Sequence, residues 1–293
     1  MLTPEQVDFY NEHGYLMVPA ALDAKEVAEL RANVDEIVAG AAKVTNHTDV
    51  YDLEDGHTPE APRVRRIKTP HKHFDYFNQL VRHPRITAML SCLLGPNIRL
   101  HGSKLNMKSA GYGAPVEWHQ DWAFYPHTND DVLAIGILLD DCAEENGPLL
   151  AIPGSHRGRT FDHHADGYFC GAITGELNQI DFSRAVALTG KAGAMSIHHA
   201  RALHGSATNR SARQRRLLLF EYAAADAWPL NGVSDFVEFN NRIVLGASTV
   251  EPRQRPAPIR MPLPPAKSQG SIYENQRGAK VRYFADVTTA ARA

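Results

Sequence analysis

A change in hydrophobic pattern near residue 97 limits the possible folds of this chain more than any other feature. Before it, apolar residues recur at helical spacing, whereas short apolar runs separated by Gly, Pro, Asn and Asp follow it. Such runs are typical of antiparallel strands rather than of βαβ units. We expect strands over residues 98–107, 132–139, 149–152, 194–198 and 217–222. The predicted fold class is therefore mainly β with flanking helices.

Start and stop signals place the helices within the first 95 residues. A capping box and a terminating glycine bound the first expected helix, over residues 4–13, and similar signals bound a second over 24–39. Apolar spacing then resumes over 74–81 and 84–94, which predicts two further helices. These helices form the N-terminal part of a predicted single domain, 1–293, whose barrel core spans residues 96–224.

Three segments lack a clear period. Residues 45–70 are polar and contain three prolines, which predicts an excursion or a mobile loop, and residues 157–191 read as an insertion between strands. The extension 225–293 holds six prolines between 252 and 265, so we expect that stretch to be extended and bound to the surface. The 45–70 loop and the segment after 224 are expected to form part of a lid.

Composition narrows the possible partners and compartment. With 31 Lys+Arg against 33 Asp+Glu and no long basic run, neither nucleic acid nor a membrane surface is an expected partner. The 3 cysteines have no zinc-site spacing, and the polar N-terminus does not resemble a secretory signal, so we expect a cytoplasmic protein. A homo-oligomer is possible. The 15 histidines are the compositional oddity.

The strongest local signal is the run Trp118-His119-Gln120-Asp121-Trp122. In an extended strand, His119 and Asp121 share one face while Gln120 points away. His204 is the third candidate ligand. Two histidines and one carboxylate around an ion leave open positions, as in non-haem Fe(II) oxygenases. The HxD pair is common by chance, so the metal-site interpretation depends on its context.

That context resembles the phytanoyl-CoA dioxygenase family of Fe(II)/2-oxoglutarate-dependent oxygenases. The matching motifs are HQD at 119–121, ENGP at 145–148, PGSH at 153–156 and HGSATNRS at 204–211, followed by Arg215. The opening helix with HGYL at 13–16 also fits, and order and spacing agree over about residues 1–224. The resemblance implies a double-stranded β-helix, or jelly-roll barrel, with the metal ligands at one open end.

The resemblance also implies roles for individual residues. His119, Asp121 and His204 would bind Fe(II), and Arg215 would bind the distal carboxylate of 2-oxoglutarate through its guanidinium fork. Further candidates for contacts with the cosubstrate are Ser206, Asn106 and Lys108, although Asn106 and Lys108 could equally be solvated strand residues. Strand alternation allows only one residue of the pair 215–216, and one of the pair 198–199, to face the barrel interior; the motif spacing favours Arg215.

Aromatic residues follow the HQD motif where a loop over the metal would meet substrate. The candidates for substrate contact are Trp122, Phe124, Tyr125 and His127, while core packing is the commoner role for Trp and Phe. Three aromatic residues of the extension could line the entrance, but packing of the tail onto the barrel is favoured for them: Trp228, Phe236 and Tyr273.

The expected reaction is hydroxylation of an unactivated C–H bond of a small metabolite or an intermediate of secondary metabolism, with O2 consumed and succinate and CO2 released. A carboxylate at Asp121 argues against halogenation, which needs that ligand position open. Desaturation, epoxidation and cyclisation are alternative outcomes of the same site. Two other classes stay open: a non-redox isomerase or hydrolase on a cupin-like barrel holding Zn(II) or Mn(II), and a non-catalytic ligand-binding barrel.

Overall fold

The computed structural model describes residues 1–111, 113–268 and 270–284. Its N-terminal part contains the four expected helices, and the first begins with the predicted capping box, in which the Gln6 N–H donates to Thr3 Oγ1 at 3.3 Å and the Thr3 N–H to Gln6 Oε1 at 2.9 Å. The α-helices are α1 Pro4–His13, α2 Ala24–Gly40, α3 Pro70–His73, α4 Asp75–Leu80, α5 Pro84–Leu94, α6 Phe236–Asn241 and α7 Ile272–Asn275.

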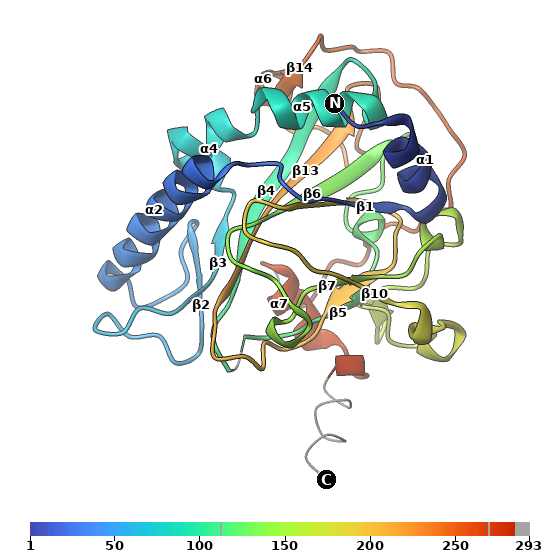
Figure 1. The fold of residues 1–293 in the computed structure, drawn as a ribbon. Helices are drawn as coiled ribbons and strands as arrows, with labels where there is room; N and C mark the ends of the chain where they lie inside the picture. Colours follow the sequence, from blue (N-terminus) through green and yellow to red (C-terminus); the bar gives the residue numbers. More distant parts are fainter. Residues whose placement is uncertain (112, 269, 285–293) are drawn as a thin grey trace.

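Two antiparallel sheets form the barrel (Figure 1). The larger sheet has the strand order β1-β11-β6-β13-β4-β3-β2 with β14 beside β4, and the smaller has the order β10-β7-β12-β5. The strands are β1 Tyr15–Val18, β2 Tyr51–Leu53, β3 Val64–Lys68, β4 Ile98–Lys108, β5 Val116–His119, β6 Val132–Leu138, β7 Leu149–Ala151, β8 His164–Ala165, β9 Tyr168–Phe169, β10 Val186–Leu188, β11 Met195–His199, β12 His204–Ser206, β13 Arg215–Ala224 and β14 Ile243–Leu245. All five expected strands are present, and the architecture is the predicted double-stranded β-helix.

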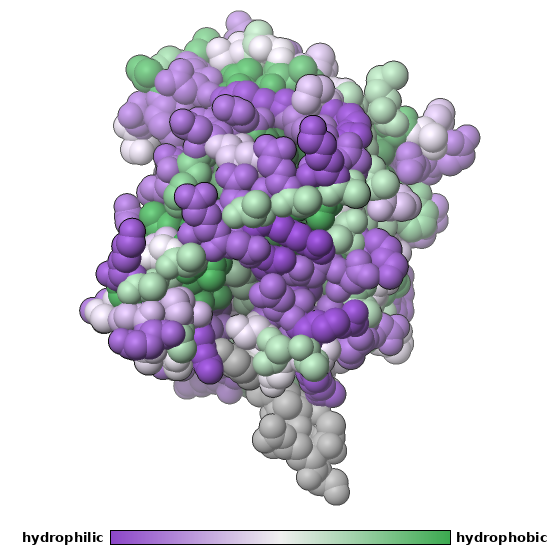
Figure 2. Space-filling view, turned by 60° about the vertical axis from the view of Figure 1, so that its left-hand side comes forward, coloured by the Kyte–Doolittle hydropathy of each residue, from purple (hydrophilic) through white to green (hydrophobic). Residues whose placement is uncertain are grey.

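The hydrophobic core lies between the larger sheet and the N-terminal helices. Leu30 of α2, Phe77 of α4 and Leu90 of α5 are fully buried against Ile197 and Leu218 of the sheet. The face that carries α2 and the β2–β3 hairpin is mostly hydrophilic (Figure 2). The apolar sides of these helices therefore face the sheet, which leaves the other face of the sheet to build a site.

The structure overturns one prediction for an irregular segment and shortens another. Residues 45–70 include the β2–β3 hairpin, and β3 pairs with β4, so the segment extends the larger sheet instead of forming a mobile loop. The stretch 157–191 lies mostly between β7 and β10, which pair in the smaller sheet, but its last residues include β10 itself. Both differences have one cause: strands of 3 to 5 residues are too short to show a clear alternation in sequence.

The proline-rich stretch is extended, as predicted, but the chain then returns to the barrel. The backbone of Pro258 accepts a hydrogen bond from Trp122 Nε1, and α7 follows after residue 271. The buried Gln276 side chain connects this tail to the barrel. It accepts a hydrogen bond from the Glu117 N–H on β5 and donates one to the Gly171 carbonyl. Within the described residues, no helix is long and apolar enough to cross a membrane.

Candidate metal centre

Two adjacent strands of the smaller sheet bring His119 and His204 side by side. His119 ends β5 and His204 begins β12, and the two are directly paired in the antiparallel register, with ring centroids 4.0 Å apart. Nδ1 of His119 lies 2.8 Å from the Glu117 carbonyl, and Nδ1 of His204 lies 3.0 Å from the Ala202 carbonyl. Because a carbonyl only accepts, both Nδ1 atoms carry the proton, which leaves each Nε2 free to bind a metal ion.

Asp121 completes the group from a tight turn. The prediction of one extended strand through the whole HQD motif is wrong, because β5 ends at His119 and Asp121 begins a 3₁₀ turn. The predicted arrangement of side chains still holds, since Gln120 points away and donates to the carbonyls of Arg159 and Arg201. Asp121 Oδ1 lies 3.7 Å from His119 Nε2 and 3.9 Å from His204 Nε2.

These distances fit a shared ion. One ligand atom from each of His119, Asp121 and His204 lies within 4.8 Å of the others, and all three residues are buried. Two ligands that each bind a metal at about 2.1 Å are at most about 4.2 Å apart, so both Asp121–histidine distances satisfy this limit. They are too long for hydrogen bonds. The donor set of two imidazoles and one carboxylate suits Fe(II).

The electrostatics of the cavity keep Asp121 ionised. Burial by itself raises the pKa of Asp121, but the nearby Lys104 ammonium and the hydrogen bond from His198 Nε2 together hold it well below its ordinary value. Burial, together with the neighbouring His119, holds the pKa of His204 well below the usual range for histidine. An anionic carboxylate beside neutral imidazoles is the protonation state that metal binding requires.

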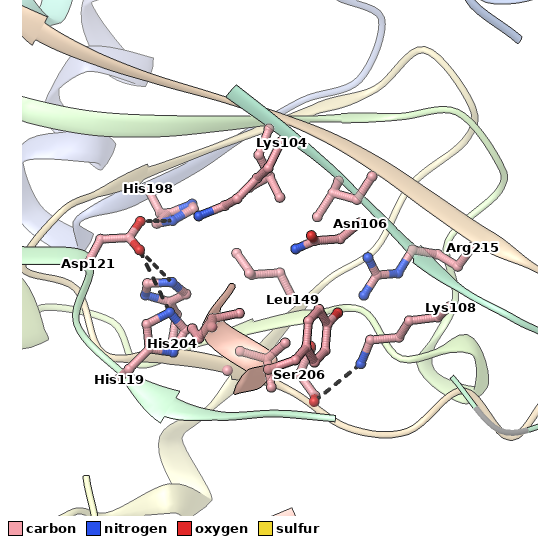
Figure 3. Close-up of a pocket in the computed structure, with 16 residues that line it drawn as sticks. Lys104, Asn106, Lys108, His119, Asp121, Leu149, His198, His204, Ser206 and Arg215 are labelled. Carbon is pink, nitrogen blue, oxygen red and sulfur yellow. Dashed lines mark hydrogen bonds and ion pairs between the residues drawn. The ribbon is translucent and has the colours of Figure 1, made fainter. Parts of the chain in front are cut away.

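Two buried cations line the same cavity away from the triad (Figure 3). Lys108 of β4 and Arg215 of β13 are direct neighbours in the sheet register. Lys108 Nζ donates to the carbonyls of Ser206 and Ala207, and Arg215 donates to the Gly147 carbonyl, but neither makes an ion pair within the described part of the chain. Burial and the neighbouring Arg215 lower the pKa of Lys108 well below its ordinary value.

The other polar residues named in the sequence analysis lie either in this cavity or on the opposite side of β13. Asn106 and Ser206 both line this cavity, and the buried Asn106 Oδ1 has no hydrogen-bond partner among the residues that the structure describes. Arg216 points to the opposite side of β13, where it forms ion pairs with Asp140 and Asp35 at 2.8 and 2.6 Å. The placement of Arg215 inside and Arg216 outside therefore agrees with strand alternation.

The aromatic candidates divide between a second cavity and the core. Phe124, Tyr125 and His127 line a neighbouring cavity of about 290 Å³, and the Phe124 ring contacts His119 with centroids 5.9 Å apart. Trp122 lines neither cavity: it is fully buried, and its Nε1 donates to the Pro258 carbonyl. The structure thus gives Trp122 a packing position, not the expected position for substrate contact.

Three residues of the metal cavity have no place in the sequence-based site. Lys104 and His198 line it beside Asp121, and Tyr273 reaches it from α7. Strand alternation from Asn106 would have found Lys104, and it does predict that one residue of the pair 198–199 faces inward. Tyr273 lines the cavity, which is the less favoured of the two roles that the sequence analysis considers for it.

A jelly-roll barrel with two histidines and one carboxylate around one point is the arrangement typical of non-haem Fe(II) oxygenases. The chain belongs to the phytanoyl-CoA dioxygenase (PhyH) family, which it matches over residues 10–217. The expected family is therefore confirmed, and so are the expected class of enzyme and its cofactors.

Individual relatives narrow the class. The chain is 42% identical over 284 residues to a probable alpha-ketoglutarate-dependent hypophosphite dioxygenase of Stutzerimonas stutzeri, covering 96% of this chain and 99% of that protein. It is 31% identical to L-proline trans-4-hydroxylase of Streptomyces griseoviridis, covering 76% and 87%. The crystal structure of EctD from S. alaskensis with bound Fe is 26% identical with a TM-score of 0.67, covering 86% of this chain and 88% of that one.

These similarities identify an Fe(II)- and 2-oxoglutarate-dependent dioxygenase with a small-molecule substrate. They argue against the two alternatives, a non-redox isomerase or hydrolase and a non-catalytic barrel, because the names of these relatives describe oxidative enzymes.

Proposed function

We propose that His119, Asp121 and His204 hold Fe(II), and that Lys108 and Arg215 hold the distal carboxylate of 2-oxoglutarate. The buried pair of cations is the observation that carries this assignment. A buried cation without a counter-ion is costly, so a cavity lined by two of them is built for an anion. The planar Arg215 fork suits a carboxylate, and Asn106 and Ser206 add polar contacts along the cavity.

The bound Fe(II) supplies the oxidising chemistry, in which O2 and 2-oxoglutarate yield succinate, CO2 and a hydroxylated substrate. The chain supplies position and shielding. Its cations orient the cosubstrate before reaction, and the aliphatic walls formed by Leu149, Leu217 and Leu219 limit the entry of water. Asp121 and the two histidines occupy one side of the site, which leaves the other side to substrate.

Hypophosphite is the first substrate that we propose. The relative named for hypophosphite matches this chain over almost its whole length, and the metal cavity is lined by cationic side chains. In the proposed reaction, one P–H bond of hypophosphite becomes a P–OH bond, which gives phosphite. One oxygen atom of O2 enters phosphite and the other enters succinate, so atoms and electrons balance.

Hydroxylation of a C–H bond of a small metabolite, as the sequence analysis predicts, is the second candidate. The cavity of about 290 Å³ beside the metal centre favours it, because that space is of the size that organic ligands occupy. We also propose that the enzyme works in the cytoplasm, since all three cysteines are free thiols in the structure.

The test is a succinate-release assay with Fe(II), 2-oxoglutarate and air, coupled to measurement of O2 uptake. Hypophosphite and L-proline are supplied separately, and phosphite is followed by ³¹P NMR. We expect hypophosphite to stimulate succinate release with phosphite formed in equal amount. Stimulation by L-proline alone would support the second candidate, and an absence of succinate under all conditions would contradict the dioxygenase assignment.

A further inference from the structure

Lys104 is a charged residue that lines the metal cavity, and the proposed function gives it no role. It lies on β4 two residues before Asn106 and four before Lys108, so the three side chains share the inner face of the strand. In Figure 3 its ammonium points toward Asp121 and His198, while Arg215 lies at the far end of the cavity. One cation therefore stands beside the metal ligands and two stand away from them.

Glu221 fixes the position of the Lys104 ammonium. The two residues come from the adjacent strands β13 and β4 and form an ion pair of 2.6 Å with little exposure to solvent. Gly102 faces Glu221 in the register, and a Cβ atom at Gly102 would lie 2.5 Å from Glu221 Oε2. The glycine thus leaves the space that the carboxylate occupies.

The charges of the cavity do not balance with metal and cosubstrate alone. Its lining contributes three cations, Lys104, Lys108 and Arg215, against the carboxylate of Asp121, and Glu221 adds a second carboxylate through its ion pair. One positive charge is left over. A divalent metal adds two positive charges and 2-oxoglutarate removes two, so the loaded cavity as a whole still carries one positive charge, although Glu221 already compensates Lys104 locally. A monoanion bound there would neutralise it.

We propose that Lys104 binds the anionic group of the substrate and holds the substrate against the metal centre, and that the substrate is a small monoanion. This inference rests on the proposed function and deepens it, because hypophosphite is such an anion. The three cations then divide the work by position. Lys108 and Arg215 bind the distal carboxylate of the cosubstrate, and Lys104 binds the anionic group of the substrate.

Binding can be tested without turnover. The protein is loaded with Zn(II), which is redox-inert, and with 2-oxoglutarate, and hypophosphite is titrated by ³¹P NMR. For Lys104→Met we expect the Kd of hypophosphite to rise on the order of 10- to 100-fold, since a hydrogen bond to a charged group is lost. Lys104→Arg keeps the charge and should recover part of that loss. The Kd of 2-oxoglutarate should change less than about 3-fold in both variants.

Two further variants separate anion binding from a purely structural ion pair. Glu221→Gln removes a competing carboxylate, so the inference expects hypophosphite to bind equally well or more tightly. Lys68→Met is the matched control: Lys68 pairs with Lys104 in the β3–β4 register and with the Asp52 carboxylate, but it does not line the cavity. Its Kd for hypophosphite should be unchanged.

Each other outcome has a definite meaning. Equal weakening by Lys104→Met and Glu221→Gln would make the pair structural and overturn the inference. A rise in the Kd of 2-oxoglutarate alone would assign Lys104 to the cosubstrate and overturn it too. So would binding of L-proline without binding of hypophosphite. If hypophosphite binds to the Zn(II) protein through Lys104 but the Fe(II) protein releases no succinate, the proposed function fails and the inference stands.

Discussion

Nε2 of His198 lies 3.4 Å from Oδ2 of Asp121, while both metal-facing histidines approach the other carboxylate oxygen, Oδ1. The two oxygens of one carboxylate therefore have separate partners. His198 comes from β11 of the larger sheet, whereas His119 and His204 belong to the smaller sheet. His198 thus fixes the orientation of Asp121 from across the cavity, and such partners of metal ligands tune metal affinity.

His198→Ala should weaken metal binding by about 10- to 100-fold, because Asp121 then loses the group that orients it. The adjacent residue provides the control, since His199 packs against His156 and Tyr10 on the other side of β11. His199→Ala should reduce stability and leave metal affinity unchanged. Competition between the protein and a Zn(II) chelator measures both constants. Equal loss of affinity in the two variants would contradict the role of His198.

Asp121→Ala and His204→Ala should each abolish turnover and most metal binding, because two ligands do not hold the ion. Gln120→Ala tests whether the effect belongs to the metal face. Gln120 lies between two of the ligands, but its side chain donates to the carbonyls of Arg159 and Arg201. This variant should unfold more easily yet still bind Zn(II). Metal content after dialysis and the midpoint of thermal unfolding report the two effects separately.

Arg215→Ala should raise the KM for 2-oxoglutarate by about 10- to 100-fold, the cost of losing hydrogen bonds to a charged group. Lys108→Met should act in the same direction. Arg216→Ala breaks ion pairs on the outer side of the same strand, so it should lower stability without changing this KM. Initial rates measured over a range of 2-oxoglutarate concentrations give the KM of each variant. The assignment is wrong if Arg216→Ala, and not Arg215→Ala, raises the KM.

The sequence predicts those parts of the site that depend on local geometry. Strand alternation places Arg215 and Arg216 on opposite faces, the motif spacing selects Arg215, and the HQD spacing turns Gln120 away from its neighbours. The pairing of β5 with β12 is not local, so the contact of His119 with His204 rests on the family resemblance. The ion pair of Lys104 with Glu221 depends on the register between β4 and β13, which no single strand reveals.

Local sequence patterns also fail to predict contacts made by the C-terminal extension and by short strands. Tyr273 reaches the cavity after an extended stretch that carries no periodic signal. The β2–β3 hairpin has few residues per strand and a polar composition, so its sequence resembles that of a loop. Local patterns thus locate the ligands, whereas long-range pairing determines what surrounds them.

Gly14 links two of the sequence motifs and provides a stability test. It ends α1 with φ +75°, and a Cβ atom there would lie 2.3 Å from Nδ1 of His156 in the PGSH motif. Gly14→Ala should lower the free energy of unfolding by about 2 kcal/mol or more, from backbone strain plus this clash. Gly167 has a similar φ of +78°, but a Cβ atom there would meet no atom of the described residues within 4 Å, so Gly167→Ala should cost only the backbone strain. Urea denaturation compares the two, and equal losses would exclude the clash.

Acid should destabilise the protein through His163. This side chain is buried, its Nε2 accepts from the Gln120 N–H at 2.9 Å and its Nδ1–H donates to the Phe161 carbonyl at 2.9 Å. Burial is the main cause that lowers the pKa of His163 to about 3. In the unfolded chain the pKa of a histidine is about 6.5. Between pH 3 and pH 6.5, the unfolded chain therefore binds a proton at this residue and the native state does not. Stability from this residue is complete above pH about 6.5 and falls as the pH drops toward 3.

His163→Gln should remove the pH dependence of stability that comes from His163. It should also lower stability at neutral pH, because the hydrogen bond from the Gln120 N–H to His163 Nε2 is lost. Between pH 6.5 and 5, wild type should lose about 2 kcal/mol more than the variant. His73→Gln is the control, since His73 lies on the surface and should keep the wild-type slope. Urea denaturation of the metal-free protein at pH 7.5, 6.5 and 5 gives the slopes. The same slope in His163→Gln and wild type would show that His163 is protonated as readily in the native state as in the unfolded chain.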